Sequence, residues 1–252
     1  MIVRKTPAEI EKMRAAGAVV ARCLRELSEA IQPGKTTTLD VDVMAEGLLA
    51  KYGALSSFKN YRGYPNTVCV AVNEEVVHGI PRRRVLQAGD ILGIDLGAIV
   101  DGWHGDAATT VAVGGETTRE AENLLRATRD ALFRGIEQAR PGKKLSDIGH
   151  AIQSYVEARG YSVVRDLVGH GIGRSMHEEP QVPNFGRPGR GVRLEEGMTL
   201  AIEPMVNIGG HEVETLGDNW TVVTRDRSLS AHFEHTVAIR KNGPDILTMA
   251  PV

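Results

Sequence analysis

Two aspartates, Asp95 and Asp106, lie in an apolar segment that runs from Ile91 to Val113. The Asp101-Gly102 pair between them is typical of a two-residue hairpin turn. With that pair as the loop, Asp106 faces Gly97, and the two aspartates become diagonal neighbours on one face. Their backbones are then roughly 7–8 Å apart. Both side chains could hold one cation or two adjacent ones, and we expect Gly97 to leave room for them.

The surroundings of the two aspartates decide between two interpretations. Aspartates are mostly solvated, which favours two exposed acids on a surface hairpin. The flanking segments are apolar, however, with the sequences ILGI and TTVAV, and this favours burial on both faces. Buried like charges repel strongly unless something positive lies between them. The hairpin therefore predicts a metal ion or an arginine beside the aspartates, and it does not distinguish the two.

The pattern of the first half of the chain returns 108 residues later. Pro33-Gly34-Lys35 corresponds to Pro141-Gly142-Lys143, and Asp95 corresponds to Glu203. A match at a fixed offset is typical of an internal duplication. Two copies related by a pseudo-two-fold axis would bring equivalent positions together where they join. We therefore expect Asp95 to meet Glu203.

Asp106 also has a counterpart, because Asp106-Ala-Ala-Thr-Thr-Val resembles Glu234-His-Thr-Val in the second half. Preservation of four acids by duplication alone would not explain why they stay inside apolar strands. The sequence predicts one α+β domain over residues 1–252, with an internal repeat of about 6–113 and 117–240. It also predicts four converging carboxylates: Asp95, Asp106, Glu203 and Glu234.

Two helices are predicted at the start of each repeat. Thr6-Pro7-Ala8-Glu9 is a capping box with proline at the first helical position, and apolar residues follow at spacings of three and four. Thr117-Thr118-Arg119-Glu120 is read as a second capping box. A strand-like run covers Thr67 to Val72. The predicted helices are about 6–31, 39–52, 117–139 and 145–159.

Composition excludes several classes of partner. The chain has 30 basic and 32 acidic residues mixed along its length, so no polybasic face for DNA or anionic lipid is expected. Its one basic run, Arg82-Arg83-Arg84, is interpreted as a solvated turn. No segment has the features of a signal peptide or membrane span. We expect a cytoplasmic protein with reduced cysteines, and Cys23 in the core.

Charge balance favours two metal ions. Four carboxylates are nearly neutralised by two divalent cations and one bridging hydroxide, whereas one cation would leave a large excess. A neutral fifth ligand is expected, and His170 is the best candidate because Gly169 and Gly171 let the backbone approach closely. Oxygen ligands with one imidazole suit Mn, Fe, Co or Zn. Attack of the metal-held hydroxide on a carbonyl group would make the protein an amide or ester hydrolase.

The chain resembles the type I methionine aminopeptidases of peptidase family M24. The resemblance runs nearly end to end, through YRGYPNTVCVAVNEEVVHGIP, IDLGAIVDGWHGDAATTV, VGHGIGRSMHEEPQVPNF, LAIEPM and SAHFEHTVAI. It implies the pita-bread (creatinase/aminopeptidase) fold, an α+β fold with two pseudo-symmetric halves of antiparallel sheet backed by helices. No zinc-finger extension precedes Thr6, and no long insert typical of the type II enzymes is evident near the end of the chain, so we expect the short bacterial form.

The resemblance also implies a role for particular residues. Glu203 would be a proton shuttle as well as a ligand. His78 and His177 would contact the scissile region and the amide carbonyl of the substrate. A further four residues would form the pocket for the methionine side chain of the substrate, although core packing is the simpler interpretation for each of them. The metal ligands would be Asp95, Asp106, His170, Glu203 and Glu234, and the pocket would be lined by Tyr61, Tyr64, Cys69 and Trp220.

The implied activity is removal of the initiator methionine from nascent chains at the ribosome, with a small second residue preferred, by a monomer. Its cofactors would be two divalent ions (Co, Mn, Fe or Zn), with a structural monovalent cation near Asn73 and Ser230. Family members often have Cys, Phe and Gln where this chain has Phe58, Met176 and His232. The alternatives are a prolidase or aminopeptidase P, which carry a large extra N-terminal domain, and a non-catalytic pita-bread binding protein that has lost its ligands.

Overall fold

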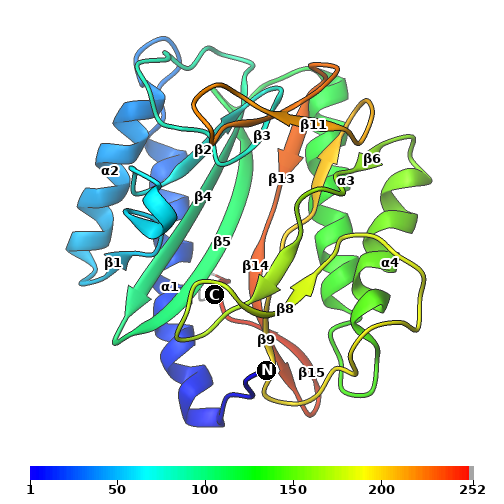
Figure 1. The fold of residues 1–252 in the computed structure, drawn as a ribbon. Coiled ribbons are helices and arrows are strands. Elements are labelled where there is room, and N and C mark those ends of the chain that lie inside the picture. The colour runs from blue at the N-terminus through cyan, green and yellow to red at the C-terminus, as the bar shows by residue number, and fades with distance from the viewer. Residues whose placement is uncertain (250–252) are drawn as a thin grey trace.

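Helices lie on both sides of a layer of strands in the computed structural model, which describes residues 1–249 (Figure 1). None of the helices in this range is long and apolar enough to cross a membrane. The helices are α1 (Pro7–Ala30), α2 (Thr38–Lys51), α3 (Arg119–Ile136) and α4 (Leu145–Glu157), with a short 3₁₀ turn η1 (Tyr61–Gly63). The strands are β1 (Leu55–Ser56), β2 (Cys69–Val72), β3 (Glu75–Val77), β4 (Ile91–Val100), β5 (Trp103–Ala112), β6 (Ser162–Val163), β7 (Gly169–Gly171), β8 (Glu178–Val182), β9 (Thr199–Ile202), β10 (Met205–Asn207), β11 (Val213–Thr215), β12 (Val222–Thr224), β13 (Ser230–His232), β14 (His235–Arg240) and β15 (Gly243–Ile246).

Each pair of helices covers its own sheet. Helices α1 and α2 share one apolar core with the antiparallel strands β2, β4 and β5, and β1 extends this sheet at its edge. Free Cys23 is buried in this core. Helices α3 and α4 share a second core with the sheet ordered β15-β14-β9-β7-β8. Figure 1 shows the first pair on one side of the strands and the second pair on the other. The remaining short strands form two three-stranded sheets, β13-β10-β6 and β11-β12-β3, within residues 1–249.

The first helix begins as its sequence predicts. The Thr6 hydroxyl accepts a hydrogen bond from the Glu9 backbone N–H at 3.3 Å, and the Glu9 carboxylate accepts one from the Thr6 N–H at 2.8 Å. This reciprocal capping box satisfies two amide groups that the helix itself leaves free. The predicted apolar face is buried against β4 and β5.

The prediction for the third helix was wrong at both ends. Its N-cap is Thr118, whose hydroxyl accepts from the Ala121 N–H at 3.1 Å, so Glu120 is not placed to complete a capping box. Thr117 instead donates its hydroxyl hydrogen to the Gly89 carbonyl at 2.6 Å. At the other end, the Ala139 N–H donates to the Ile136 carbonyl at 2.9 Å. This bond spans three residues and makes a tighter turn than an α-helix, which ends at Ile136. The strand predicted from Thr67 also begins later, at Cys69.

The hairpin of β4 and β5 has the predicted register. Asp95 pairs with Ala108, and Gly97 pairs with Asp106. Asp101 and Gly102 form the turn with φ angles of 49° and 75°, which suit a twisted two-residue loop. The expected role of Gly97 was wrong, however. A Cβ there would lie 2.7 Å from the Cβ of Ser57, so the missing side chain makes room for the segment beside the sheet and not for a cation.

The two halves join where β5 meets the start of β14. The Glu234 N–H donates to the Ala108 carbonyl at 3.0 Å, and the Ala108 N–H donates to the Glu234 carbonyl at 3.4 Å. Next to this pair, the Asp106 N–H donates to the Thr236 hydroxyl at 3.0 Å, which in turn donates to the Asp106 carbonyl at 2.8 Å. These bonds cross from one half to the other and fix the backbones of Asp106 and Glu234 side by side.

Matching hydrogen bonds recur in the two halves. The Gly34 N–H donates to the Leu86 carbonyl at 2.8 Å, and 108 residues later the Gly142 N–H donates to the Leu194 carbonyl at 2.9 Å. Each bond joins the loop that follows the first helix of its half to the segment that precedes a strand carrying or adjoining one of the acids. The duplicated single domain stays a proposal, and these equivalent contacts support it.

A close contact between α1 and β5 gives a test of the packing. A Cβ on Gly105 would lie 2.6 Å from the backbone nitrogen of Gly17, so Gly105→Ala would force the helix away from the sheet. We expect it to lower the free energy of unfolding by about 1–3 kcal/mol in chemical denaturation. Gly47→Ala in α2 is the control, because nothing lies within 4 Å of the added Cβ. It should be stabilising by about 0.5–1 kcal/mol, and equal effects of the two substitutions would contradict the packing argument.

Candidate metal centre

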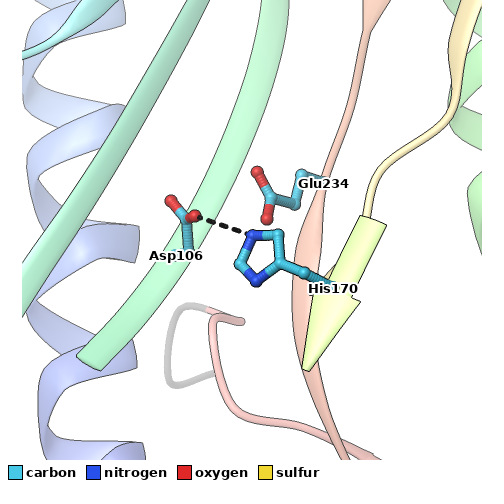
Figure 2. Close-up of side chains that lie close together, drawn as sticks. All are labelled: Asp106, His170 and Glu234. Carbon is cyan, nitrogen blue, oxygen red and sulfur yellow. Dashed lines mark ion pairs between the residues drawn. The ribbon is translucent and has the colours of Figure 1, made fainter. Parts of the chain in front are cut away.

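The four predicted carboxylates converge at the junction of the two halves. Asp95 and Asp106 come from the middle of β4 and β5, Glu203 directly follows β9, and Glu234 directly precedes β14. Asp106 and Glu234 are each only 2% exposed. Figure 2 shows their side chains pointing toward each other, with His170 of β7 reaching the same point. Each half therefore contributes two acids to one buried cluster.

His170 lies within the cluster of acids. Its Nε2 is 3.8 Å from Asp106 Oδ2 and 3.6 Å from Glu203 Oε1. Asp106, His170 and Glu234 each offer one ligand atom, and these atoms all lie within 4.8 Å of one another (Figure 2). Donors at such separations are too far apart to bond directly and close enough to share a cation.

The hydrogen bonding of His170 defines which of its nitrogens is free. Nδ1 is 2.8 Å from the Gly171 carbonyl oxygen, and a carbonyl oxygen can only accept, so Nδ1 carries the proton. Burial lowers the pKa of His170 to about 4, which keeps the ring neutral at pH 7. The Nε2 lone pair therefore faces the carboxylates, as a metal-binding imidazole requires.

Glycines beside His170 permit this placement. A Cβ on Gly169 would lie 2.3 Å from the Ala201 carbonyl oxygen, and one on Gly171 would lie 2.2 Å from the Glu179 carbonyl oxygen. Both contacts are far below the van der Waals distance, so a side chain at either position would push β7 off its neighbours. The expectation that these glycines allow close backbone approach is confirmed.

The acids have no cationic side chain to balance them. Within residues 1–249, the ion-pair partners of these carboxylates are histidines only. Asp95 Oδ1, Asp106 Oδ1 and Glu234 Oε1 are buried and have no hydrogen-bond partner in the same part of the chain. Burial raises the pKa of all four carboxyl groups, and repulsion from Asp106 adds to the shift in the other three. Of the two alternatives, a metal ion fits these residues and an arginine does not.

A cavity of about 140 Å³ opens beside the acids. Its lining includes every residue that the sequence predicts for the site: Asp95, Asp106, His170, Glu203, Glu234, His78, His177, Tyr61, Tyr64, Cys69 and Trp220. Phe58 and Met176 line it as well and belong to the apolar cluster under it. The ring of Tyr64 meets that of Trp220 edge-on, with centroids 5.1 Å apart. The cavity therefore has one ionic wall and one aromatic, sulfur-containing wall.

Two further histidines border the cavity. His177 Nδ1 is 3.0 Å from the Tyr61 hydroxyl, and the ring of His177 lies 4.1 Å from that of His170 between centroids. Burial, followed by the charge of His170, lowers the pKa of His177 to about 3. His78 has a φ of 58°, a left-handed conformation that side chains rarely adopt. Strain of this kind is typical of functional positions.

Other residues at the site escaped the sequence analysis. Arg62 lines the cavity and its guanidinium lies 5.3 Å from the centroid of the Tyr61 ring, but an arginine in a polar loop carries no signal of such a role. Arg82 and Arg83 are exposed, as the interpretation of Arg82-Arg83-Arg84 as a solvated turn predicts, but that interpretation missed two ion pairs. Arg82 and Arg84 form ion pairs with buried Glu75 at 2.7 and 3.1 Å. These contacts hold the segment that carries His78.

Comparison with known proteins gives a consistent result. Residues 11–241 match the sequence model of metallopeptidase family M24. The chain is 54% identical to the methionine aminopeptidase of Clostridium acetobutylicum, over 99% of each protein. It is 52% identical to methionine aminopeptidase 1 of Bacillus subtilis, over 98% of this chain and 99% of the relative.

Solved structures agree with the sequence comparison. The crystal structure of the methionine aminopeptidase from Thermotoga maritima has a TM-score of 0.96 and 50% identity, covering 99% of this chain and 100% of that one. The prolidase from Pyrococcus furiosus has a TM-score of 0.79 and 23% identity, with 99% of this chain and 66% of the prolidase covered. The second likeness shows the fold alone. The predicted pita-bread fold is confirmed.

The raised carboxyl pKa values predict how metal and pH affect stability. Folding holds these acids protonated above their unfolded pKa of about 4, so the metal-free protein binds more protons folded than unfolded and loses stability as pH rises through the folded pKa values. The neutral histidines act in the opposite sense only below about pH 6.5. We therefore expect the melting temperature of chelator-treated protein to fall as the pH rises above about 6.5, where the histidines no longer oppose the loss.

Divalent cations should remove this loss, because they replace the protons on the carboxylates. The measurement is differential scanning fluorimetry of metal-free and Mn²⁺-loaded protein across the same pH range. A metal-free melting temperature that stays level as the pH rises above about 6.5, or that Mn²⁺ does not raise, would contradict the electrostatic account.

Proposed function

The chain belongs to metallopeptidase family M24, and from this premise we infer that it is a metallo-exopeptidase that hydrolyses the peptide bond after an N-terminal methionine. One observation carries the inference to the site: the acids and His170 meet at a cavity whose lining also includes aromatic and sulfur-containing side chains. A cluster of metal ligands beside a small apolar cavity suits an enzyme that binds one apolar side chain and cleaves next to it.

We assign five residues as metal ligands: Asp95, Asp106, His170, Glu203 and Glu234. Two divalent cations, when bound, supply an activated water molecule and polarise the scissile carbonyl group. The unpartnered oxygens of Asp95, Asp106 and Glu234 support this assignment, because buried carboxylate oxygens without hydrogen bonds need a cation. The donor set fits Mn, Fe, Co or Zn, all of which accept carboxylates with imidazole.

Glu203 is also our candidate for the proton shuttle. Its side chain is 15% exposed, more than that of Asp106, and it lines the cavity in which the substrate would lie. In this role Glu203 takes a proton from the attacking water and delivers it to the leaving amine.

His177 and His78 act as neutral donors in the proposed reaction. The lowered pKa of each imidazole, caused chiefly by burial, keeps it uncharged at neutral pH. If the Tyr61 hydroxyl donates to Nδ1 of His177, the proton of the ring is on Nε2, where it can bond to the carbonyl oxygen as negative charge develops. His78 lies in the first repeat, whereas His177 lies in the second. In this proposal His78 contacts the scissile region of the substrate.

Methionine specificity is assigned to the apolar wall. Tyr64 directs its hydroxyl to the backbone, 2.9 Å from the Gly79 carbonyl oxygen, and so presents the ring rather than the hydroxyl to the cavity. Contacts between a thioether and Tyr61, Tyr64, Cys69 or Trp220 are favourable because sulfur is polarisable. The small volume supports a preference for a small second residue.

The setting of the reaction follows from its substrate. Initiator methionine is found at the ends of nascent chains, so we propose that the enzyme works in the cytoplasm near the ribosome, as a monomer. We also propose a structural monovalent cation near Asn73 and Ser230. These residues are adjacent, because the Ser230 N–H donates to the Asn73 carbonyl at 2.9 Å, and that oxygen keeps a second lone pair.

A peptide assay tests the proposed function directly. Purified protein with Mn²⁺, Fe²⁺ or Co²⁺ should release methionine from Met-Ala-Ser and should lose this activity when a chelator is added. An Xaa-Pro dipeptide and a peptide with leucine at the first position are the controls, and both should be poor substrates. Activity that resists the chelator, or faster cleavage before proline than after methionine, would refute the proposal.

Asp106→Asn tests the ligand assignment separately. Loss of one carboxylate from the shared cluster should lower both the bound metal, measured by elemental analysis, and the rate of methionine release by roughly 10²-fold or more. Asp101→Asn is a matched control on the same hairpin, because Asp101 is exposed at the turn and asparagine tolerates its positive φ. An unchanged metal content in Asp106→Asn would show that the carboxylate is not a ligand.

A further inference from the structure

His232 is held against the metal centre by the same junction that places the acids. It ends β13, is 4% exposed, and its backbone forms two bonds with Thr110 of β5. The His232 N–H donates to the Thr110 hydroxyl at 3.0 Å, and the Thr110 hydroxyl donates to the His232 carbonyl at 2.7 Å. Like Asp106 and Glu234, His232 therefore has a backbone fixed across the two halves.

The side chain of His232 has an unused nitrogen. Its Nε2 is buried and has no hydrogen-bond partner among the described residues. The nearest acid oxygen, Glu203 Oε2, is 3.7 Å away, which is too long for a hydrogen bond. Leaving a buried nitrogen unpaired is costly. A bound metal ion, which accepts a nitrogen lone pair, would remove this cost.

The same arrangement surrounds His170. Glu203 lies between two imidazoles, with Oε1 3.6 Å from His170 Nε2 and Oε2 3.7 Å from His232 Nε2. Glu203, His232 and Glu234 each offer one ligand atom, and these atoms all lie within 4.8 Å of one another, as those of Asp106, His170 and Glu234 do. The two triads share Glu234. Each triad has two carboxylates and one imidazole.

We propose that His232, through Nε2, is a sixth protein ligand of the divalent metal site. This inference rests on the two-cation site of the proposed function and adds a second imidazole to it. A second nitrogen donor shifts the preference of the site from Mn²⁺ toward Co²⁺ and Zn²⁺.

Replacement of His232 by glutamine distinguishes a role as metal ligand from a role as hydrogen-bond donor. His232→Gln keeps an N–H group that can reach Glu203 but removes the imidazole nitrogen. We expect it to weaken the binding of Co²⁺ and Zn²⁺ by roughly tenfold or more in chelator competition, and that of Mn²⁺ by less. His232→Ala should show the same loss. Unchanged Co²⁺ affinity in His232→Gln would mean that His232 only positions Glu203, and would overturn the inference.

Proton NMR of Co²⁺-loaded protein counts the imidazoles, because each ring bound to cobalt gives its own strongly shifted signals. We expect signals from two rings in the wild type and from one in His232→Gln. His235→Gln is the matched control. His235 follows Glu234 directly, but its Nδ1 pairs with the Thr248 hydroxyl at 2.9 Å and its ring lies 5.8 Å from that of Phe133. It should keep both sets of signals.

Failure of the ligand role of His232 can be distinguished from failure of the proposed peptidase function. Methionine release by a protein that shows one shifted imidazole would disprove the ligand role of His232 and leave the peptidase intact. Absence of Co²⁺ binding together with absence of methionine release would disprove both. Two rings in the wild type and in His232→Gln would place the second imidazole elsewhere and would also overturn the inference.

Discussion

Repulsion among four buried carboxylates is the constraint on which the rest of the structure depends. Asp95, Asp106, Glu203 and Glu234 are held together without a lysine or arginine ion pair in residues 1–249. Such an arrangement opposes folding unless protons or cations neutralise it. The surrounding structure must therefore resist separation of the acids. It does so through the backbone, because each acid lies within or directly beside a strand whose hydrogen bonds are already satisfied.

The junction of the two halves is where this resistance is greatest. The reciprocal bonds between Ala108 and Glu234, and those between Asp106 and Thr236, cross between chain segments that are far apart in sequence. Each half brings two acids and its own apolar core, so neither half alone carries a complete cluster. The metal centre therefore forms only when the halves are docked. Any cation that binds all four acids must in turn stabilise that docking, since it binds the folded state alone.

Sequence reasoning succeeded where local pattern determines the answer. The Asp101-Gly102 turn sets the register of β4 and β5, and the capping box at Thr6 sets the start of α1. It failed where the deciding contact leaves no periodic signal in the sequence. Gly97 is required by Ser57, and Arg82 and Arg84 are required by buried Glu75, yet neither relationship produces a periodic pattern. The convergence of the acids was predicted only because the repeat implied a symmetry, which is long-range information written in the sequence.

The backbone origin of the site also explains how one fold can support different peptidases. Strand pairing places the acids, so the ionic wall of the cavity depends little on the residues around it. The opposite wall is made of side chains that the strands do not constrain, among them Phe58, Met176 and Trp220. Substitutions there change the shape of the cavity without moving the acids. Side chains of this wall can therefore diverge while the fold is retained, and the prolidase of 23% identity shows how far the sequence can change within the same fold.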